Sequence, residues 1–278
     1  MRIVTSKQEM ARLCREAPRP LGLAPTMGAL HGGHLALVER ARGENATVAA
    51  TIFVNPAQFG PGEDLAGYPR DLEQDLAKLR PQGVDLVYVP PLDEVYPPGF
   101  DTWVEVGRLA ARLEGARRPG HFRGVATVVT KLLSLTRPDR AYFGQKDAQQ
   151  TLVVCQLVRD LDLGVEVVVV PTVRDPDGLA LSSRNAYLTT EQRRAAPVVY
   201  RALCRAEQLW GRGVRDGERL RQDVRQVLQA ERLVEEIDYV SVADAATLEE
   251  LDQVGGQALV SVAVKLGRPH LIDNIILG

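Results

Sequence analysis

The fold is decided by the stretch LGLAPTMGALHGGH, residues 21–34, in which an apolar run passes through a glycine-containing loop into a helical pattern. The run Leu21–Pro25 predicts a strand, and His34–Arg42 predicts the helix that follows. Glycines between them let a ligand approach the backbone closely. A helix that begins there presents unpaired N–H groups and the positive end of its dipole, which suits a phosphate group.

The same alternation continues through the first two-thirds of the chain. Short apolar runs predict four more strands, at Thr47–Val54, Val84–Val89, Arg140–Phe143 and Val165–Val170. The helical patterns between them are Arg70–Arg80, Gly124–Leu135 and Asp147–Leu161. Nearly continuous apolar strands are typical of parallel sheets covered on both faces. We therefore predict an α/β fold, a Rossmann-like doubly wound parallel sheet, with ligands at the carboxyl ends of its strands.

The pattern changes after Pro171. Helical periodicity covers residues 190–212 and 216–230, and three strands are expected at Glu236–Ala243, Gln257–Leu266 and Pro269–Ile276. Helices followed by strands indicate a smaller C-terminal α+β domain. The predicted domains are residues 1–171 and 172–278.

Composition narrows the classes of function. The 278 residues carry 34 Lys and Arg against 36 Asp and Glu, a formal net charge of −2, so no basic excess favours nucleic acid. No apolar run approaches the ~20 residues that span a bilayer. The start of the chain lacks the apolar core of a signal peptide, and three scattered cysteines outside any CxxC fit reduced thiols. We expect a cytoplasmic protein without a membrane or nucleic-acid partner.

His31 and His34 open the first predicted helix. Histidines three residues apart share a helical face, and imidazoles there can donate hydrogen bonds to charge that builds on phosphoryl oxygens. A glycine turn beside two surface histidines is an equally good interpretation of this tetrapeptide alone. A two-histidine metal site is less favoured, because no third ligand of the right type is near. The chain has no GxxxxGK[ST] motif, which excludes a P-loop.

Four other segments carry polar groups in loops of the predicted sheet. Amides Asn55 and Gln58 follow the second strand, guanidiniums Arg117, Arg118 and Arg123 precede a buried-looking helix, Lys146 follows the fourth strand, and Ser182, Ser183 and Arg184 follow the fifth. Amides orient small ligands, and guanidiniums clamp phosphate or carboxylate. Each segment also has a structural interpretation. Asn55 and Gln58 fit a strand-end turn, and the three arginines fit a solvated charge cluster. The segment after Lys146 fits a capping box of Asp147 and Gln150, and the segment with Ser182 fits an interdomain linker.

Together these segments resemble the pantothenate synthetase family, part of the HxGH nucleotidyltransferase superfamily. The resemblance rests on PTMGALHGGH (25–34), FVNPAQF (53–59), RPGHFRG (118–124), FGQKD (143–147) with Gln150, LSSRN (181–185) and LIDN (271–274), in the family's order. It implies an ATP-dependent ligase that joins pantoate to β-alanine through a pantoyl adenylate, with Mg²⁺, releasing AMP and pyrophosphate. It also implies a homodimer formed by the N-terminal domains.

The family's functional residues carry over position by position. His34, His31 and Lys146 are the implied catalytic groups. The implied ATP site comprises Met27, Gly28, His31, Gly33, His34, Gly144, Lys146, Asp147, Val173, Leu181, Ser182, Ser183 and Arg184. The implied pantoate-binding residues are Gln58 and Gln150. Asn55 and Arg118 are further substrate-binding candidates from their own chemistry, and Asp75 is a possible metal contact. Ala57 and Ala148 depart from the family pattern, which usually has a larger side chain at the first and an aromatic one at the second.

Three rival functions stay open at this point. They are a nucleotidyltransferase that acts on a phosphate acceptor, a tRNA-binding domain derived from a synthetase, and a nucleotide sensor without catalysis. The two glutamines and the full second segment argue against a nucleotidyltransferase for a phosphate acceptor. The lack of a basic excess argues against a tRNA-binding domain. The presence of His31, His34, Lys146 and Arg184 together argues against a sensor without catalysis. Because the Ser182–Arg184 segment lies beyond residue 171, we expect the second domain to act as a lid, with Asp175–Gly178 as a candidate hinge.

Overall fold

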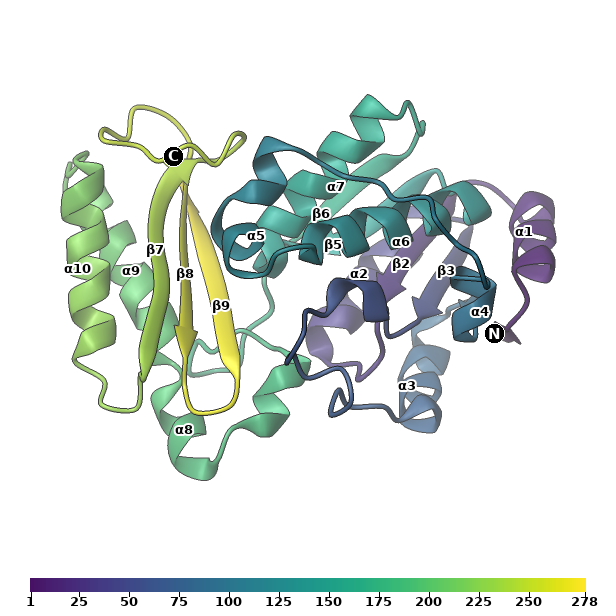
Figure 1. The fold of residues 1–278 in the computed structure, drawn as a ribbon, viewed down its shortest axis with the longest axis horizontal. Coiled ribbons are helices and arrows are strands. Elements are labelled where there is room, and N and C mark those ends of the chain that lie inside the picture. Colours follow the sequence, from purple (N-terminus) through teal and green to yellow (C-terminus); the bar gives the residue numbers. More distant parts are fainter. The chain divides into compact units, whose positions relative to one another are not determined.

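The computed structural model describes residues 1–278, which divide into two compact units. The first comprises residues 1–145 and 149–171, and the second comprises residues 146–148 and 172–278. A six-stranded sheet forms the centre of the first unit, and a three-stranded sheet belongs to the second (Figure 1).

The six-stranded sheet is parallel throughout and has the order β1-β4-β3-β2-β5-β6. In that order its strands are Arg2–Val4, Leu86–Tyr88, Thr47–Ile52, Leu21–Thr26, Arg140–Gly144 and Glu166–Val170. The chain moves outward from β2 to β3 and β4, then returns to place β5 on the other side of β2. This reversal of direction beside β2 is the defining feature of a doubly wound sheet, so the predicted fold class is confirmed.

Helices cover both faces of this sheet. On one face lie α1 (Lys7–Glu16), α6 (His121–Thr136) and α7 (Ala148–Asp160), and on the other lie α2 (Gly32–Glu44) and α3 (Leu72–Leu79). Successive strand residues serve opposite faces: Leu23 packs with the first group of helices and Ala24 with the second. Burial on both sides explains why these strands read as continuous apolar runs. Two short helices, α4 (Leu92–Val95) and α5 (Leu113–Arg117), interrupt the long segment before α6.

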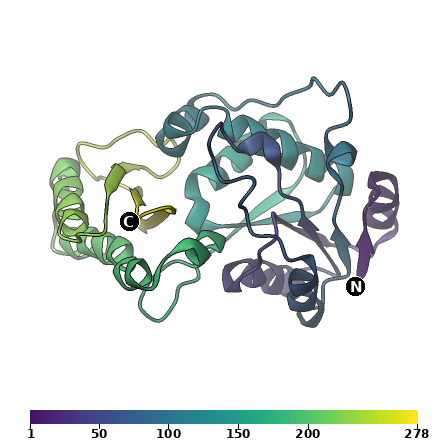
Figure 2. The same ribbon diagram turned by 60° about the horizontal axis from the view of Figure 1, so that its bottom comes forward.

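The second unit is an antiparallel sheet with helices on one side. Its strands β7 (Glu236–Asp244), β8 (Ala258–Lys265) and β9 (His270–Leu277) pair in chain order. The helices α9 (Val198–Gly211) and α10 (Gly217–Gln229) pack on this sheet in Figures 1 and 2. Apolar residues of both helices and of the sheet form one core.

The structure corrects two details of the predicted elements. The single helix expected over residues 190–212 is wrong, because α8 (Thr190–Ala195) ends before Pro197 and α9 starts after it. Proline lacks the N–H that a continuous helix would need there. Strand β1 was not predicted, because only one of its three residues is buried and it therefore leaves no apolar run. No helix is both long enough and apolar enough to cross a bilayer.

Candidate active site

The loops after β2, β3 and β5 start at neighbouring strand ends. Strand β2 pairs with β3 along its whole length and with β5 at Leu23 and Ala141. Because all three strands are parallel, their carboxyl ends meet at one edge of the sheet, where doubly wound proteins bind ligands. The sequence places His31, Asn55 and Gly144 in or next to these three loops.

His31 and His34 form the start of α2. His31 is the N-cap, and its Nδ1 accepts a hydrogen bond from the Gly33 N–H at 3.1 Å. The His31 N–H donates to His34 Nδ1 at 3.4 Å, and the two rings lie 4.1 Å apart. A neutral imidazole that accepts at Nδ1 carries its proton on Nε2. Both rings are therefore held as Nε2–H donors, the form that can stabilise negative charge on a phosphate.

The loop that joins β2 to α2 is bound by α3. Asp75 accepts the Ala29 N–H at 2.9 Å and the Leu30 N–H at 2.7 Å, one on each carboxylate oxygen. The carboxylate is almost fully buried, with 1% of the residue exposed. Nowhere in the structure do three or more His, Cys, Asp or Glu side chains form a group that could hold a metal ion. Asp75 thus binds backbone N–H groups in this structure, and its expected metal contact stays a prediction.

The side-chain amide of Gln58, which follows β3, is held at both ends. Its Oε1 accepts from Asn55 Nδ2 at 3.0 Å, and its Nε2 donates to the Met27 sulfur at 3.0 Å. Asn55 is itself buried, and it accepts the Tyr96 hydroxyl hydrogen at 2.8 Å. Burial raises the pKa of Tyr96 to about 12, although the hydrogen bond to Asn55 lowers it, so the hydroxyl stays protonated and donates. These bonds fix which end of the Gln58 amide is the donor.

Arg118 and His121 hold the backbone of Gln58. The Arg118 guanidinium binds both oxygens of Glu63, at 2.8 and 2.6 Å, and also contacts Gln58 O at 3.4 Å. His121 accepts from Arg118 at Nε2, which makes Nδ1 its protonated nitrogen and the donor to Gln58 O at 2.8 Å. The charge of Arg118 is therefore already partnered by Glu63. In this structure Arg118 orders the segment around Gln58.

Gln150 differs from its neighbour Gln149. The Gln149 amide binds Leu109 O, Arg112 O and the Glu114 N–H, and the residue is buried. Gln150 is half-buried and its side-chain amide makes no hydrogen bond within the protein, so that amide is available to a ligand. The expected role of Gln150 in binding the substrate stays a prediction.

Of the other expected ATP residues, Gly28 and Gly144 belong to the first unit, and those from Lys146 onward belong to the second. Lys146 donates to Asp147 Oδ1 at 3.1 Å, and Lys146 O accepts from Asn274 Nδ2 at 2.9 Å. Leu181 N–H donates to Val173 O at 3.0 Å, and Ser182 caps a short 3₁₀ turn by accepting the Arg184 N–H. Arg174, which stacks over Tyr200 and pairs with buried Asp273, braces this hairpin. The segments after β5 and after Val173 thus contribute to one folded unit.

Comparison with known proteins identifies the family. The family model described as pantoate-beta-alanine ligase matches residues 2–276. The chain belongs to the pantoate-beta-alanine ligase family. The pantothenate synthetase of Roseiflexus sp. strain RS-1 is 57% identical over 277 residues, which cover 100% of this chain and 99% of the relative. That of Chloroflexus aurantiacus strain ATCC 29366 is 60% identical over 267 residues, 96% of this chain and 95% of the relative.

Solved structures of pantoate-beta-alanine ligases share the fold. Pantothenate synthetase from Thermus thermophilus superposes with a TM-score of 0.95 at 51% identity, covering 99% of both chains. The ligase from Francisella tularensis, crystallised with "Beta-gamma ATP and Beta-alanine", has a TM-score of 0.81 at 33% identity and covers 99% of this chain and 97% of its own. The sheet order, the helices on both faces and the antiparallel C-terminal sheet are therefore those of the family.

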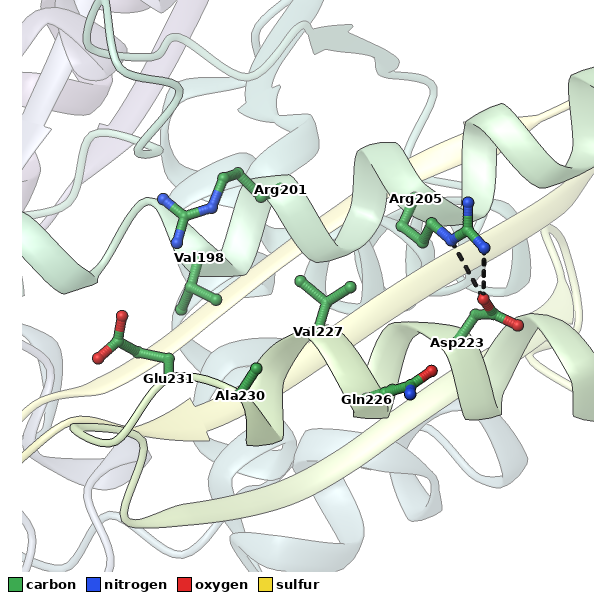
Figure 3. Close-up of a pocket in the computed structure, with 8 residues that line it drawn as sticks. All are labelled: Val198, Arg201, Arg205, Asp223, Gln226, Val227, Ala230 and Glu231. Carbon is green, nitrogen blue, oxygen red and sulfur yellow. Dashed lines mark hydrogen bonds and ion pairs between the residues drawn. The ribbon is translucent and has the colours of Figure 1, made fainter.

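Three residues that the sequence did not point to support members of the candidate site. They are Tyr96, which contacts Asn55, Glu63, which contacts Arg118, and Lys78, which contacts Leu30. Each lies far from its partner along the chain, so no short motif contains both. A pocket of about 430 Å³ between α9 and α10, lined by Val198, Arg201, Arg205 and Asp223 among others, contains none of the expected site residues (Figure 3).

Proposed function

We propose that this protein condenses pantoate with β-alanine at the expense of ATP, forming pantothenate, AMP and pyrophosphate. The observation that carries the proposal is the contact of Gln58 with Met27, because it joins the acid-binding amide to the loop that bears His31 and His34. Membership of the pantoate-beta-alanine ligase family supports the reaction. The ligands named for the Francisella tularensis ligase support ATP and β-alanine as substrates.

The reaction proceeds in two transfers. A pantoate carboxylate oxygen attacks the α-phosphorus of ATP, the bond to pyrophosphate breaks, and pantoyl adenylate forms. The β-alanine amine then attacks the acyl carbon, the bond to AMP breaks, and the amine gives up a proton. Activation is needed because a free carboxylate is a poor electrophile toward an amine. Such transfers depend on positioning and charge neutralisation more than on a protein nucleophile.

The ATP phosphates are bound at the start of α2. Its N-terminal N–H groups and the Nε2–H donors of His31 and His34 suit a phosphate that gains negative charge. Lys146 and Arg184 add positive charge, and Ser182 and Ser183 add hydroxyls. The other members of the proposed nucleotide site are Met27, Gly28, Gly33, Gly144, Asp147, Val173 and Leu181.

Pantoate is bound by the amides of Gln58 and Gln150. The first presents Nε2–H as a donor, because Asn55 occupies its oxygen, and the second offers both ends of its amide. Asn55 and Arg118 support Gln58 rather than binding the acid themselves. Mg²⁺, held by the ATP phosphates, would neutralise part of their negative charge. We also propose that the protein is a cytoplasmic homodimer formed by the N-terminal domains. Sedimentation at micromolar concentration tests the dimer, and the mass of a monomer would contradict it.

A pantoate-dependent exchange of pyrophosphate into ATP, measured without β-alanine, tests this function. We expect exchange, because adenylate formation is reversible and precedes amide formation. A nucleotidyltransferase for a phosphate acceptor, a tRNA-binding domain or a sensor would give no exchange that depends on pantoate. Amide formation without exchange would show that the two transfers do not occur in this order.

A further inference from the structure

One turn of α3 binds the two residues that immediately precede the first histidine. The Asp75 carboxylate accepts both the Ala29 and the Leu30 N–H, and the Lys78 ammonium donates to Leu30 O at 2.6 Å. Positions three apart share a helical face, so both side chains reach the same loop. We propose that Asp75 and Lys78 form a clamp, called here the α3 clamp, that positions the loop carrying His31 and His34.

The backbone of this loop requires such support. Gly28 has φ +83° and Ala29 has φ +50°, two successive residues in the left-handed region. An alanine rarely adopts this conformation, and it persists only where its surroundings hold it. Gly28 is fitted to the clamp, because a Cβ at this position would lie 2.9 Å from Asp75 Oδ2. The carboxylate and the glycine are therefore complementary parts of one arrangement.

A metal ion does not fit the same carboxylate. Each of its oxygens already accepts a backbone N–H, and only 1% of the residue is exposed, so a hydrated cation would reach the carboxylate only if the loop moved away. Such a movement would cost the two buried N–H groups their acceptor. Mg²⁺ also prefers a set of oxygen ligands, whereas the neighbouring group on this face of α3 is the Lys78 ammonium. The donors around Asp75 suit a backbone support.

The clamp acts on the histidines through the chain. Leu30 is followed by His31, whose N–H and Nδ1 bind His34 and Gly33 and so fix both rings. Movement of Leu30 therefore moves both donors relative to the phosphate. A displacement of about 1 Å at a reacting centre can cost about a hundredfold in rate. Asp75 and Lys78 are positioning residues, and their effect on rate rests on the function proposed above.

Asp75→Asn is the decisive variant. An amide can accept only one of the two N–H groups, and its own NH₂ would face the other donor. In ¹⁵N-labelled protein, the Ala29 and Leu30 amide protons should exchange slowly in the wild type and lose protection in the variant. Glu73→Gln makes the same chemical change on an exposed position of α3 and should leave both amides protected. Unchanged protection in Asp75→Asn would overturn the clamp.

The dependence of activity on Mg²⁺ separates the clamp from a metal ligand. For Asp75→Asn we expect kcat to fall about tenfold to a hundredfold, while the half-saturating Mg²⁺ concentration and the KM for pantoate change less than about twofold. A rise of tenfold or more in the Mg²⁺ requirement, with kcat restored at saturating Mg²⁺, would overturn the proposal and make Asp75 a metal ligand.

Lys78→Met is a second variant for the case in which Asp75→Asn does not fold. It removes one donor from a half-buried position and should lower kcat while weakening protection at Leu30. Wild-type kcat and protection in this variant would overturn the part assigned to Lys78. The exchange measurement on amides needs no substrate, so it tests the clamp even if the wild type shows no pantoate-dependent exchange of pyrophosphate.

Discussion

At the scale of single residues, hydrogen bonds to the backbone decide what each polar side chain can do. His31 and His34 both accept backbone N–H groups at Nδ1, which leaves Nε2 as the protonated nitrogen. Gln58 has its oxygen occupied by Asn55, which leaves its nitrogen as the donor. The site therefore contains side chains whose donor and acceptor ends are set before any ligand arrives, so binding costs little reorganisation.

His34→Ala should lower turnover by about 10²–10³, because it removes a donor that acts on developing phosphate charge. The KM for pantoate should change much less, since pantoate is bound elsewhere. His34→Gln, which keeps an N–H donor, should recover part of the rate. Steady-state kinetics with each substrate varied would measure both effects. A turnover of His34→Ala within a few-fold of the wild type would refute the catalytic role.

Tyr96→Phe should raise the KM for pantoate about threefold to tenfold, because it removes the donor that holds Asn55, and an ordinary hydrogen bond contributes about 0.5–1.5 kcal/mol. The KM for ATP should stay near its wild-type value. Tyr88→Phe, in β4, removes the hydroxyl of a buried tyrosine whose side chain makes no hydrogen bond in the protein, and is the control. An equal effect of both substitutions on pantoate would contradict the positioning of Gln58 through Asn55.

At the scale of elements, close packing of α6 against the end of β3 places Gln58. The 3₁₀ turn η1 (Pro56–Gln58) touches α6 at Gly124, where an added Cβ would lie 2.2 Å from Ala57 O. Asn55 also donates to Gly124 O at 3.1 Å. Glycine is therefore required at this point of the helix by the approach of another backbone, not by a turn.

Gly124→Ala should destabilise the protein by about 1–3 kcal/mol, as overpacking does, and should weaken pantoate binding by displacing η1. Gly43→Ala is the control, because Gly43 lies in α2 with nothing within 4 Å of an added Cβ. There the same substitution should stabilise by up to about 1 kcal/mol through helix propensity. Denaturant unfolding would measure both. Shifts of the same sign would show that the contact with Ala57 does not control the packing.

The ion pair between Glu63 and Arg118 should make the free energy of unfolding depend on pH in the acidic range. Burial raises the pKa of Glu63, but the hydrogen bonds and the charge of Arg118 lower it further, so the net pKa is below the ordinary value of 4.5. A carboxyl whose pKa is lower in the folded than in the unfolded protein stabilises the fold fully at pH values above its pKa in the unfolded protein. That stabilisation is lost as the pH falls through its pKa in the folded protein. This window lies at and below about pH 5.

Glu63→Gln should therefore reduce the free energy of unfolding at pH 7 and converge with the wild type as the pH approaches 3. Unfolding curves collected at several pH values would show this. Glu73→Gln, an exposed position, should not change the slope. A constant difference between Glu63→Gln and the wild type from pH 7 to pH 3 would contradict the assignment.

For the molecule as a whole, the residues of the proposed site divide between the two units of the chain. His31, His34 and Gln58 belong to the first, and Lys146, Ser182 and Arg184 belong to the second. The candidate hinge at Asp175–Gly178 is braced within the second unit, because Arg193 binds Asp175 at 2.7 Å and Asp177 at 2.6 Å. Any hinge is therefore better sought where the chain passes from Pro171 to Thr172.

ATP together with pantoate should favour a closed arrangement of the two units, because closure shields an adenylate from water. Small-angle scattering should then give a smaller radius of gyration with both ligands than without them. Pantoate alone is the control and should leave the profile unchanged. An unchanged radius with both ligands, together with ligand contacts confined to residues before 171, would contradict the lid.

Local sequence patterns were enough to predict five strands of the large sheet, the α+β character of the second unit, and the family. Apolar runs and helical periodicity are local signals, and each of the five predicted strands of the large sheet occurs close to its predicted range. The motifs from PTMGALHGGH to LIDN are also local, since each is a short run whose residue types match the chemistry of a phosphate or an acid. The edge strand β1 and the break at Pro197 were missed.

Only the tertiary structure decided how the polar residues are used. Asp75 lies 45 residues from Leu30, Arg118 lies 55 residues from Glu63, and Tyr96 lies 41 residues from Asn55. No local pattern specifies such pairs, because the chain must first fold to bring their elements together. Hydrogen-bond direction and burial then fix the result: a carboxylate enclosed by backbone N–H groups supports a loop, and a guanidinium bound to a carboxylate orders its neighbours.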